Sequence, residues 1–525
     1  MPKRHGDDDL YREMLRGVKQ MRICAVVSSW VSFPVEIRRM ILEEVCQAKH
    51  RGWTSCAAVC KEWQFLIETR NFSQLKLQTG CLDEFSRIML DRRRRKFVRY
   101  ISLNMELPRY GCDSCNKVEG ASSRVSNCHL IGKATYKLFS ILGTWRPTDG
   151  GLTLDLSAYS PSDSEHFFRN YPCGPDYGDP IRHQQSAPTE LWSDRKHGWV
   201  SGRRVRAPTA AATMRIFSPI LPAIPKVTPM VPVVTGLVIR RQFRRQISPG
   251  GLRALWDKLP RLQSLVYEPW SFWRNWERLQ QRGTRLDRRV YATFLLSYTL
   301  QDFPSHVRTL SIFEDFNQQF QSTLEANSAY RTFLTTDPAA YRQLVQVLAS
   351  KSCNLERLYI SFMVEAQDFF DACQQSYTWP CLQSLTLTSS LLTPDTPKEE
   401  IFTLLHNASL AALKMPQLET MALWLGRRGG ASAVIYHREK GSRRATLTWR
   451  GTWGLKLDRH VIEAWKKVAS DTCHLVVEME RVQPALINSH GDAIWHLRLP
   501  KGVIHPVSLW QICQEGTMQR FMAIV

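Results

Sequence analysis

The hexapeptide LQSLVY at residues 262–267 belongs to a pattern that recurs along the chain and decides its fold. The pattern is an apolar residue, two variable residues, Leu or Met, one variable residue and a final apolar residue. It also occurs in VTGLVI (234–239), VRTLSI (307–312), LERLYI (355–360), LQSLTL (382–387) and LETMAL (418–423). Short apolar runs of this kind, rich in Leu, Val and Ile and bounded by turn residues, are typical of β-strands. We therefore predict one strand at each occurrence.

The spacing of these strands suggests a repeat architecture. A helical stretch precedes the strands, for example at residues 341–351 and 401–414. Successive occurrences are separated by as few as 27 residues (355 to 382) and as many as 48 (307 to 355). The short spacing matches a leucine-rich repeat, whose units bury their apolar faces only by stacking on one another. We predict an irregular, leucine-rich-repeat-like helix–strand solenoid. The alternative, a mixed α/β domain whose strands merely share a composition, stays open.

The segments on either side differ in composition and divide the 525-residue chain into several parts, as its length also suggests. The predicted fold class is α+β / α/β multidomain. The expected parts are a polar N-terminal tail (1–28), a helical domain (29–78), first helix–strand units (79–159), an irregular Pro/Gly-rich insertion (160–233), the repeat-like array (234–428) and a small C-terminal α+β domain (429–525).

The N-terminal helical domain carries the most informative residue order, FPVEIRRMILEEVCQAKHRGWTSCAAVCKEWQFLIETRNFSQLKL at residues 33–77. Pro34 suits the first turn of a helix, and Ile37, Met40 and Ile41 follow at helical spacing on one face. A second helix is expected after Gly52, with Val59 and Trp63 on its apolar face. The combined apolar surface is too large for so small a unit to bury by itself.

This order of residues resembles the F-box. The resemblance covers about 45 residues and is carried by Phe33-Pro34, Glu36-Ile37, Ile41-Leu42, Val59-Cys60-Lys61-x-Trp63, Asn71-Phe72 and Leu75-Lys-Leu77. Phe33 stands where the family usually has Leu, which keeps the position apolar. Taken with the ragged repeats and the aromatic-rich C-terminal part, the whole chain resembles the F-box proteins that are abundant in filamentous fungi.

The resemblance implies a function and a set of contact residues. F-box proteins dock on a Skp-type adaptor and thereby join a cullin–RING ubiquitin ligase, so the chain is expected to be a substrate receptor. The adaptor-binding residues are then Phe33, Pro34, Ile37, Ile41, Leu42, Val59 and Trp63. The usual target-binding place of a leucine-rich-repeat array is its concave strand face, where the expected residues are Gln263, Arg308, Glu356, Gln383 and Glu419. The target itself is unknown.

The charge of the chain leaves a second function open. Its 70 Lys and Arg against 48 Asp and Glu give a net charge of +22, which permits binding to acidic proteins or nucleic acid. The basic run Arg92–Lys96 and the pairs Arg203-Arg204, Arg240-Arg241 and Arg244-Arg245 are candidates for such a surface. No zinc-finger or RNA-recognition signature accompanies them, so nucleic acid is not the expected partner. The alternative function is an F-box scaffold acting outside a ligase, associated with the nucleus or with nucleic acid through this basic surface.

Cys112-x-x-Cys115, followed by Cys128-His129, raises the question of a zinc site. Such a site needs four ligands, and the first pair has suitable spacing. The second pair does not, because adjacent Cys and His side chains rarely converge on one ion. We therefore expect loop thiols, with no metal and no cofactor, and the zinc alternative stays open.

No motif of a known catalytic site is present. The sequence lacks Gly-x-Ser-x-Gly, His-Glu-x-x-His and the phosphate-binding glycine patterns. We therefore expect a non-catalytic receptor subunit. The 14 scattered Cys fit reduced thiols, and no segment has the composition of a secretory signal or a membrane span. The expected location is cytoplasmic, nuclear or both, without a membrane partner.

Overall fold

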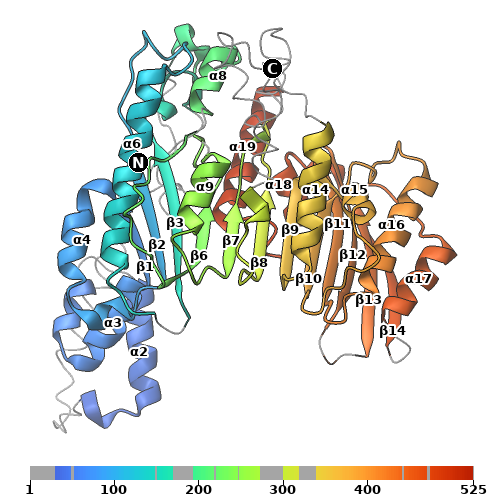
Figure 1. Ribbon diagram of the computed structural model, residues 1–525, viewed down its shortest axis with the longest axis horizontal. Coiled ribbons are helices and arrows are strands. Elements are labelled where there is room, and N and C mark those ends of the chain that lie inside the picture. The colour runs from blue at the N-terminus through green and yellow to red at the C-terminus, as the bar shows by residue number, and fades with distance from the viewer. Residues whose placement is uncertain are drawn as a thin grey trace, which may run out of the picture. The chain divides into compact units, whose positions relative to one another are not determined.

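The computed structural model is mixed α/β and contains a twelve-stranded, mostly parallel sheet (Figure 1). It describes residues 30–48, 53–147, 150–169, 193–217, 220–245, 247–271, 299–317, 338–439, 441, 443–469 and 473–523. The chain divides into two compact units, Met1–Ser73 and Gln74–Val525. The division falls within the expected helical domain, because the last residues of the F-box-like pattern already belong to the first strand of the sheet.

The N-terminal unit is helical, as predicted. Its elements are η1 (Trp30–Ser32), α2 (Val35–Ala48), η2 (Trp53–Ala58) and α3 (Lys61–Ser73). Pro34 immediately precedes α2 and its carbonyl accepts the amide of Arg38 at 3.1 Å, which starts the helix. Glu36 lies in the first turn of α2, where a negative charge is favourable.

The large sheet adds its strands in chain order. These are β1 (Gln74–Gln78), β2 (Tyr100–Glu106), β3 (Leu152–Tyr159), β6 (Val234–Ile239), β7 (Ser264–Tyr267), β8 (Thr309–Phe313), β9 (Arg357–Glu365), β10 (Ser384–Thr388), β11 (Thr420–Arg427), β12 (Gly430–Arg438), β13 (Arg444–Gly451) and β14 (His474–Arg481). Neighbouring strands are parallel apart from the antiparallel pairs β11–β12 and β12–β13. Each of the six predicted strands is confirmed, from β6 to β11.

Helices connect most of the parallel strands. They are α4 (Leu82–Ile88), α5 (Arg92–Arg95), α6 (Ala121–Leu142), α8 (Ala210–Ile216), α9 (Pro249–Trp256), α14 (Pro338–Ser352), α15 (Ala366–Asp371), α16 (Lys398–Ala412) and α17 (Arg459–Ala469). Two more helices, α18 (His490–His496) and α19 (Pro506–Ala523), follow the last strand. Of these, α14, α15, α16 and α17 each contact the next and form a row on one face of the sheet (Figure 1).

The opposite face is covered in its central part by the end of the chain. Ile494 of α18 and Ile512 of α19 share one buried cluster with Tyr359 of β9 and Trp424 of β11. Figure 1 shows α18 and α19 behind the strands, on the side away from α14 and α16. Residues 429–525 were expected to form a separate domain closing the array. Instead β12–β14 continue the same sheet, and the last helices fold back over it. They cover it because the strands β9 and β11 carry large apolar side chains on both faces.

The described parts of the insertion at residues 160–233 contain more regular structure than its composition predicted. Its described parts include η4 (Pro161–Ser164), η5 (His166–Phe168), η6 (Arg195–His197) and a two-stranded sheet of β4 (Trp199–Val200) and β5 (Arg203–Arg204). Phe167, Phe168 and Trp199 are buried, and Phe167 and Phe168 share a buried apolar cluster with Cys115 and Trp270 from outside the insertion.

Among the described residues, none of the helices has both the length and the apolar character that crossing a membrane requires.

Candidate docking surface and candidate metal centre

The N-terminal unit exposes an unusual amount of apolar surface. Seven apolar side chains of this unit are between 38% and 64% exposed: Phe33, Val35, Ile37, Met40, Ile41, Val59 and Phe65. Ile37 and Ile41 lie four residues apart on α2, which places them on one side of the helix, and Phe33 lies two residues before the helix begins. A helix of a globular protein normally buries such a stripe. We call these seven residues the apolar surface of the N-terminal unit.

Most of the predicted adaptor-binding residues belong to this surface or adjoin it. Pro34 is also exposed. Trp63 is half-buried, with its ring 5.4 Å from that of Trp30. Leu42 differs, because only 1% of it is exposed and it cannot contact a partner without a rearrangement. Sequence reasoning missed Val35 and Phe65, which lie within the F-box-like stretch but are not among its matched positions.

A polar contact fixes α2 against α3 within this unit. The Glu62 carboxylate accepts a hydrogen bond from Trp30 Nε1 at 2.9 Å and pairs with Arg38 Nε at 3.3 Å. Glu62 lies in the first turn of α3, Arg38 lies on α2, and Trp30 lies in η1. The contact therefore holds all three elements in the arrangement that presents the apolar surface.

The predicted target-binding residues form a row along the amino edge of the sheet. Each of Gln263, Arg308, Glu356, Gln383 and Glu419 directly precedes its strand, and each donates its backbone amide to the residue one strand earlier at 2.7–2.8 Å. The row is continuous, but it lies at the strand starts and not on a concave strand face. Part of the strand face expected to bind the target is covered by α18 and α19.

A groove near the C-terminus is a second candidate target surface. It has a volume of about 940 Å³. It is lined by Arg450, Glu480, Arg481, Val482, Gln483, Leu486, Ile494, Trp495, His496, Arg498, Leu499, Pro500, Lys501, Ile504, Pro506 and Leu509. We call it the C-terminal groove. Trp495 is 70% exposed, an unusual position for so large an apolar side chain.

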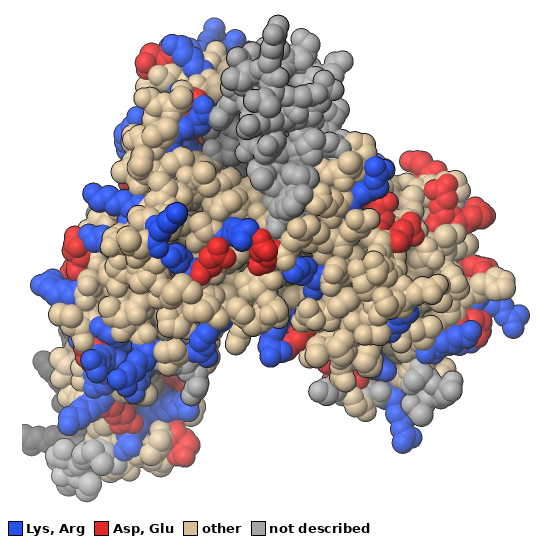
Figure 2. Space-filling model, in the orientation of Figure 1, with Lys and Arg blue, Asp and Glu red and all other residues tan. Residues whose placement is uncertain are grey.

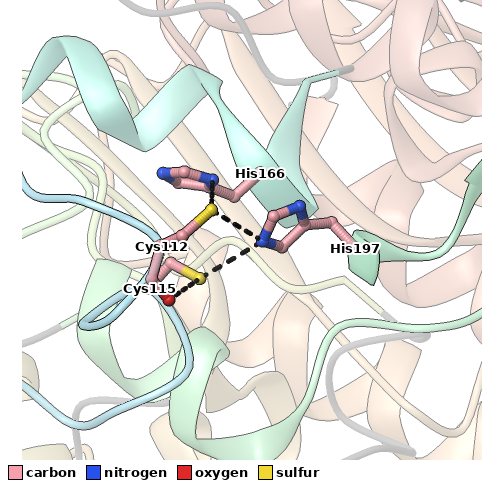
Figure 3. A group of neighbouring side chains, drawn as sticks. All are labelled: Cys112, Cys115, His166 and His197. Carbon is pink, nitrogen blue, oxygen red and sulfur yellow. Dashed lines mark hydrogen bonds between the residues drawn. The ribbon is translucent and has the colours of Figure 1, made fainter. Parts of the chain in front are cut away.

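The third candidate site is a cluster of two thiols and two imidazoles (Figure 3). It consists of Cys112, Cys115, His166 and His197, whose sulfur and nitrogen donor atoms all lie within 4.8 Å of one another. We call it the Cys2His2 cluster. Cys112 Sγ lies 3.4 Å from His166 Nδ1 and 3.6 Å from His197 Nε2. Cys115 Sγ lies 3.4 Å from the same His197 nitrogen.

Three loops position these side chains. Cys112 and Cys115 follow β2 in a tight turn, in which the amides of Ser114 and Cys115 donate to the Gly111 carbonyl at 3.1 and 3.0 Å. His166 follows β3. Because β2 and β3 are parallel, both loops leave the carboxyl edge of the sheet. His197 comes from the insertion and ends η6.

The surroundings of the cluster are largely apolar. Cys115 belongs to a buried group with Phe167, Phe168 and Trp270. Burial raises the pKa of the Cys115 thiol, and burial also lowers the pKa of the His166 ring. Cys115 and His197 are buried, His166 is half-buried and Cys112 is exposed.

The sequence identified only half of this cluster. Cys112 and Cys115 are in it, but Cys128 and His129 are not: both lie on α6, where His129 is exposed. The missing partners were His166 and His197, whose distance from the Cys pair along the chain follows no spacing rule. Only the parallel pairing of β2 with β3 brings His166 to the thiols.

The basic residues do not form one surface. Arg240 and Arg241 are buried and paired with Asp155 and Asp315, and Arg245 is buried and paired with Asp163. On the face drawn in Figure 2, Lys and Arg side chains form small separate groups among uncharged and acidic residues. Two of the Arg pairs that suggested an acidic or nucleic-acid partner, Arg240-Arg241 and Arg244-Arg245, are thus buried inside the fold.

A family of unknown function, DUF6546, matches residues 302–505. This range runs from the residues before β8 to those before α19 and includes most of the C-terminal groove, but neither the N-terminal unit nor the Cys2His2 cluster. A comparison with curated proteins finds no match.

Proposed function

We propose that the chain is a substrate receptor of a Skp–cullin–F-box ubiquitin ligase. The N-terminal unit docks on the Skp-type adaptor, and the sheet unit, a leucine-rich-repeat-like array in this proposal, holds a protein target. Ubiquitin transfer by the partner enzymes then becomes effectively local, because the receptor keeps target and enzyme together. The receptor itself needs no catalytic group for this task.

The observation that carries the proposal is the apolar surface of the N-terminal unit. Contiguous exposed apolar residues on a small helical unit mark a site of protein interaction. Fully burying a side chain of this kind contributes about 1.5–3 kcal/mol, and a few such side chains usually dominate an interface. The order of residues in this unit supplies the identity of the partner, since it resembles the F-box.

The first experiment tests adaptor binding with a double variant, Pro34→Ala with Ile37→Ala. Both residues are exposed, so the N-terminal unit should keep its fold. We expect affinity for a purified Skp-type adaptor to fall at least tenfold, a loss of about 1.4 kcal/mol, measured by titration calorimetry. The matched control is Leu410→Ala with Leu413→Ala, two side chains near the end of α16 that are each 49% exposed.

The control should bind as tightly as the wild type. Unchanged adaptor affinity in the Pro34→Ala, Ile37→Ala variant, with an unchanged circular dichroism spectrum, would rule out this docking mode. Equal weakening of adaptor binding by the two double variants would rule it out as well.

For the target, the C-terminal groove favours an acidic segment. Four of its lining residues are cationic, and Glu480 is its one carboxylate. Glu480 already pairs with Arg450 at 2.7 Å, which leaves Arg481 and Lys501 exposed beside Trp495. An acidic peptide that also carries an apolar residue would complement the charged and apolar side chains that line the groove.

A second experiment distinguishes two candidate target-binding sites, the C-terminal groove and the row of residues at the amino edge of the sheet. Proteins that accumulate on the receptor when cullin activity is inhibited are quantified by mass spectrometry. We expect Trp495→Ala with Lys501→Glu to lose the accumulated proteins and to retain the adaptor. The comparison variant replaces the row with Ala: Gln263, Arg308, Glu356, Gln383 and Glu419. If only the row variant loses those proteins, the target binds the amino edge and the groove assignment is wrong.

The alternative, a nucleic-acid-associated scaffold, has less support. Arg240, Arg241 and Arg245 are buried, so they cannot contribute to a basic surface that binds nucleic acid. Binding to nucleic acid that weakens steeply with salt would favour it, because each phosphate contact releases counterions.

A further inference from the structure

We propose that the Cys2His2 cluster binds one zinc ion, which ties together three loops at the carboxyl edge of the sheet. The donor distances carry the first step. Bond lengths of about 2.3 Å for Zn–S and about 2.0–2.1 Å for Zn–N place sulfur and nitrogen donors of a tetrahedral site about 3.6 Å apart. Three of the four sulfur–nitrogen distances of the cluster are 3.4, 3.6 and 3.4 Å, and all donor atoms lie within 4.8 Å of one another.

The second step is the orientation of His197. Its Nδ1 lies 2.7 Å from Asp194 Oδ2, so Nδ1 carries the proton and donates it to the carboxylate. The lone pair of Nε2 then faces the two sulfurs. A carboxylate behind a histidine is the usual support of a metal-binding imidazole, because it fixes the tautomer and increases the basicity of the ligand nitrogen. Asp194 also lies 3.6 Å from Arg169.

The third step is the conformation of His166. Its backbone has φ of +51°, a left-handed conformation that is uncommon for a residue with a side chain. The carbonyl of His166 accepts the indole N–H of Trp199 at 2.9 Å, which holds this conformation and turns Nδ1 toward Cys112. Within the described residues, His166 Nε2 is buried without a hydrogen bond, and the Glu165 carboxylate lies 3.9 Å away.

The donor set defines the kind of site. Two thiolates and two neutral imidazoles are soft and borderline ligands that select zinc over magnesium or calcium. Four protein ligands fill a tetrahedral shell and leave no open position for a substrate, so the site is structural. The two thiolates balance the charge of the ion. The metal would fasten two parts of the insertion, at His166 and His197, to the loop after β2.

The test uses the full chain, purified without chelators from zinc-supplemented cells. Cys112→Ser is the informative variant, because Cys112 is exposed and its replacement opens no cavity. Cys128→Ser is the matched control, a cysteine on α6 outside the cluster. We expect one zinc ion per chain by elemental analysis in the wild type and in Cys128→Ser, and a large loss in Cys112→Ser. Replacement by cobalt should give the intense visible absorption of a tetrahedral thiolate site.

The results that overturn the proposal are equally definite. They are a wild type without stoichiometric metal and without the cobalt spectrum, equal zinc contents in the two Ser variants, or a Cys112–Cys115 disulfide in protein prepared anaerobically. Asp194→Asn should lower zinc affinity about tenfold to a hundredfold in a chelator competition, with full occupancy at saturating zinc. Unchanged affinity would overturn the role of Asp194. Adaptor binding by the N-terminal unit is not involved, so this proposal and the proposed function fail separately.

Discussion

Arg241 is the residue whose replacement should most clearly destabilise the sheet unit. Its guanidinium, 3% exposed, pairs with Asp315 after β8 and makes two hydrogen bonds of 2.8 Å to the Glu515 carboxylate on α19. It also lies 4.6 Å from the centre of the Trp270 ring. The side chain of Asp315 is fully buried and that of Glu515 is 10% exposed. One cation thus neutralises two carboxylates that have little access to water.

The change Arg241→Met removes the charge and keeps most of the apolar volume. Removing one partner of a buried ion pair costs about 3–5 kcal/mol, because the remaining charge is left uncompensated. A typical domain has a stability of about 5–15 kcal/mol, so this is a large fraction. The control Arg253→Met removes an arginine that is 48% exposed and pairs with Asp302 at 2.6 Å. A surface pair of this kind contributes about 0–1 kcal/mol.

The assay is urea unfolding followed by tryptophan fluorescence and far-ultraviolet circular dichroism. The loss in free energy of unfolding should be several times larger for Arg241→Met than for Arg253→Met. A loss below about 1 kcal/mol for Arg241→Met, or equal losses for both variants, would refute the reasoning about buried charge.

The pH dependence of that loss gives an independent check. Burial alone raises the pKa of the Asp315 carboxyl, but Arg241 and then His490 outweigh burial, and the net pKa is lowered. A lowered pKa contributes stability at neutral pH that is lost as the pH falls through the folded-state value. Without Arg241 the carboxyl takes up a proton more readily in the folded state. The difference between wild type and Arg241→Met should therefore shrink as the pH is lowered from about 7 toward about 4, the ordinary pKa of an Asp, and a widening difference would contradict the assignment.

Three further changes have outcomes that the structure defines. Burial lowers the pKa of His505 to about 4, so as the pH falls the imidazole is protonated in the unfolded chain before it is protonated in the folded one. Wild-type thermal stability should therefore fall between about pH 6.5 and the folded-state pKa. His505→Gln should flatten that part of the plot of thermal stability against pH. Gly151→Ala should destabilise by more than about 1 kcal/mol in urea unfolding, because φ is +64° and the new Cβ would overlap the hydroxyl oxygen of Thr235. Trp465→Ala should cost about 3–5 kcal/mol since its side chain is 1% exposed, whereas Trp495→Ala, at 70% exposed, should leave the unfolding midpoint nearly unchanged.

The strands were the most predictable part of the fold, for a physical reason. In β6 and β10 every apolar position of the recurring pattern is buried, and such a run has few stable alternatives to a strand in a covered sheet. The order of strands was predictable as well, because short helical connections favour neighbouring parallel strands. The packing of α18 and α19 against the sheet was not predictable, because the residues that they contact on β9 and β11 are far from them in the sequence.

The candidate metal centre shows where such reasoning stops. A Cys-x-x-Cys pair is recognisable because both ligands lie in one turn. His166 and His197 reach the thiols only because β2 pairs with β3 and because the insertion folds back, and neither contact has a local signal. Proximity in sequence instead suggests Cys128-His129 as the second half of the site. Both residues lie on α6, outside the cluster.

The described residues of the insertion at 160–233 are held at the carboxyl edge of the sheet by specific contacts. Arg245, buried after β6, pairs with Asp163 of η4, and Asp163 also accepts the Tyr110 hydroxyl at 3.1 Å. Tyr110 lies two residues before Cys112, and Asp163 three residues before His166. The ion pair and the Cys2His2 cluster thus fasten the same two loops from opposite ends, one through charge and one through ligands suited to a metal. A buried ion pair constrains geometry more narrowly than apolar packing does, and in the proposal above a bound metal adds a second constraint on the described parts of this Pro- and Gly-rich segment.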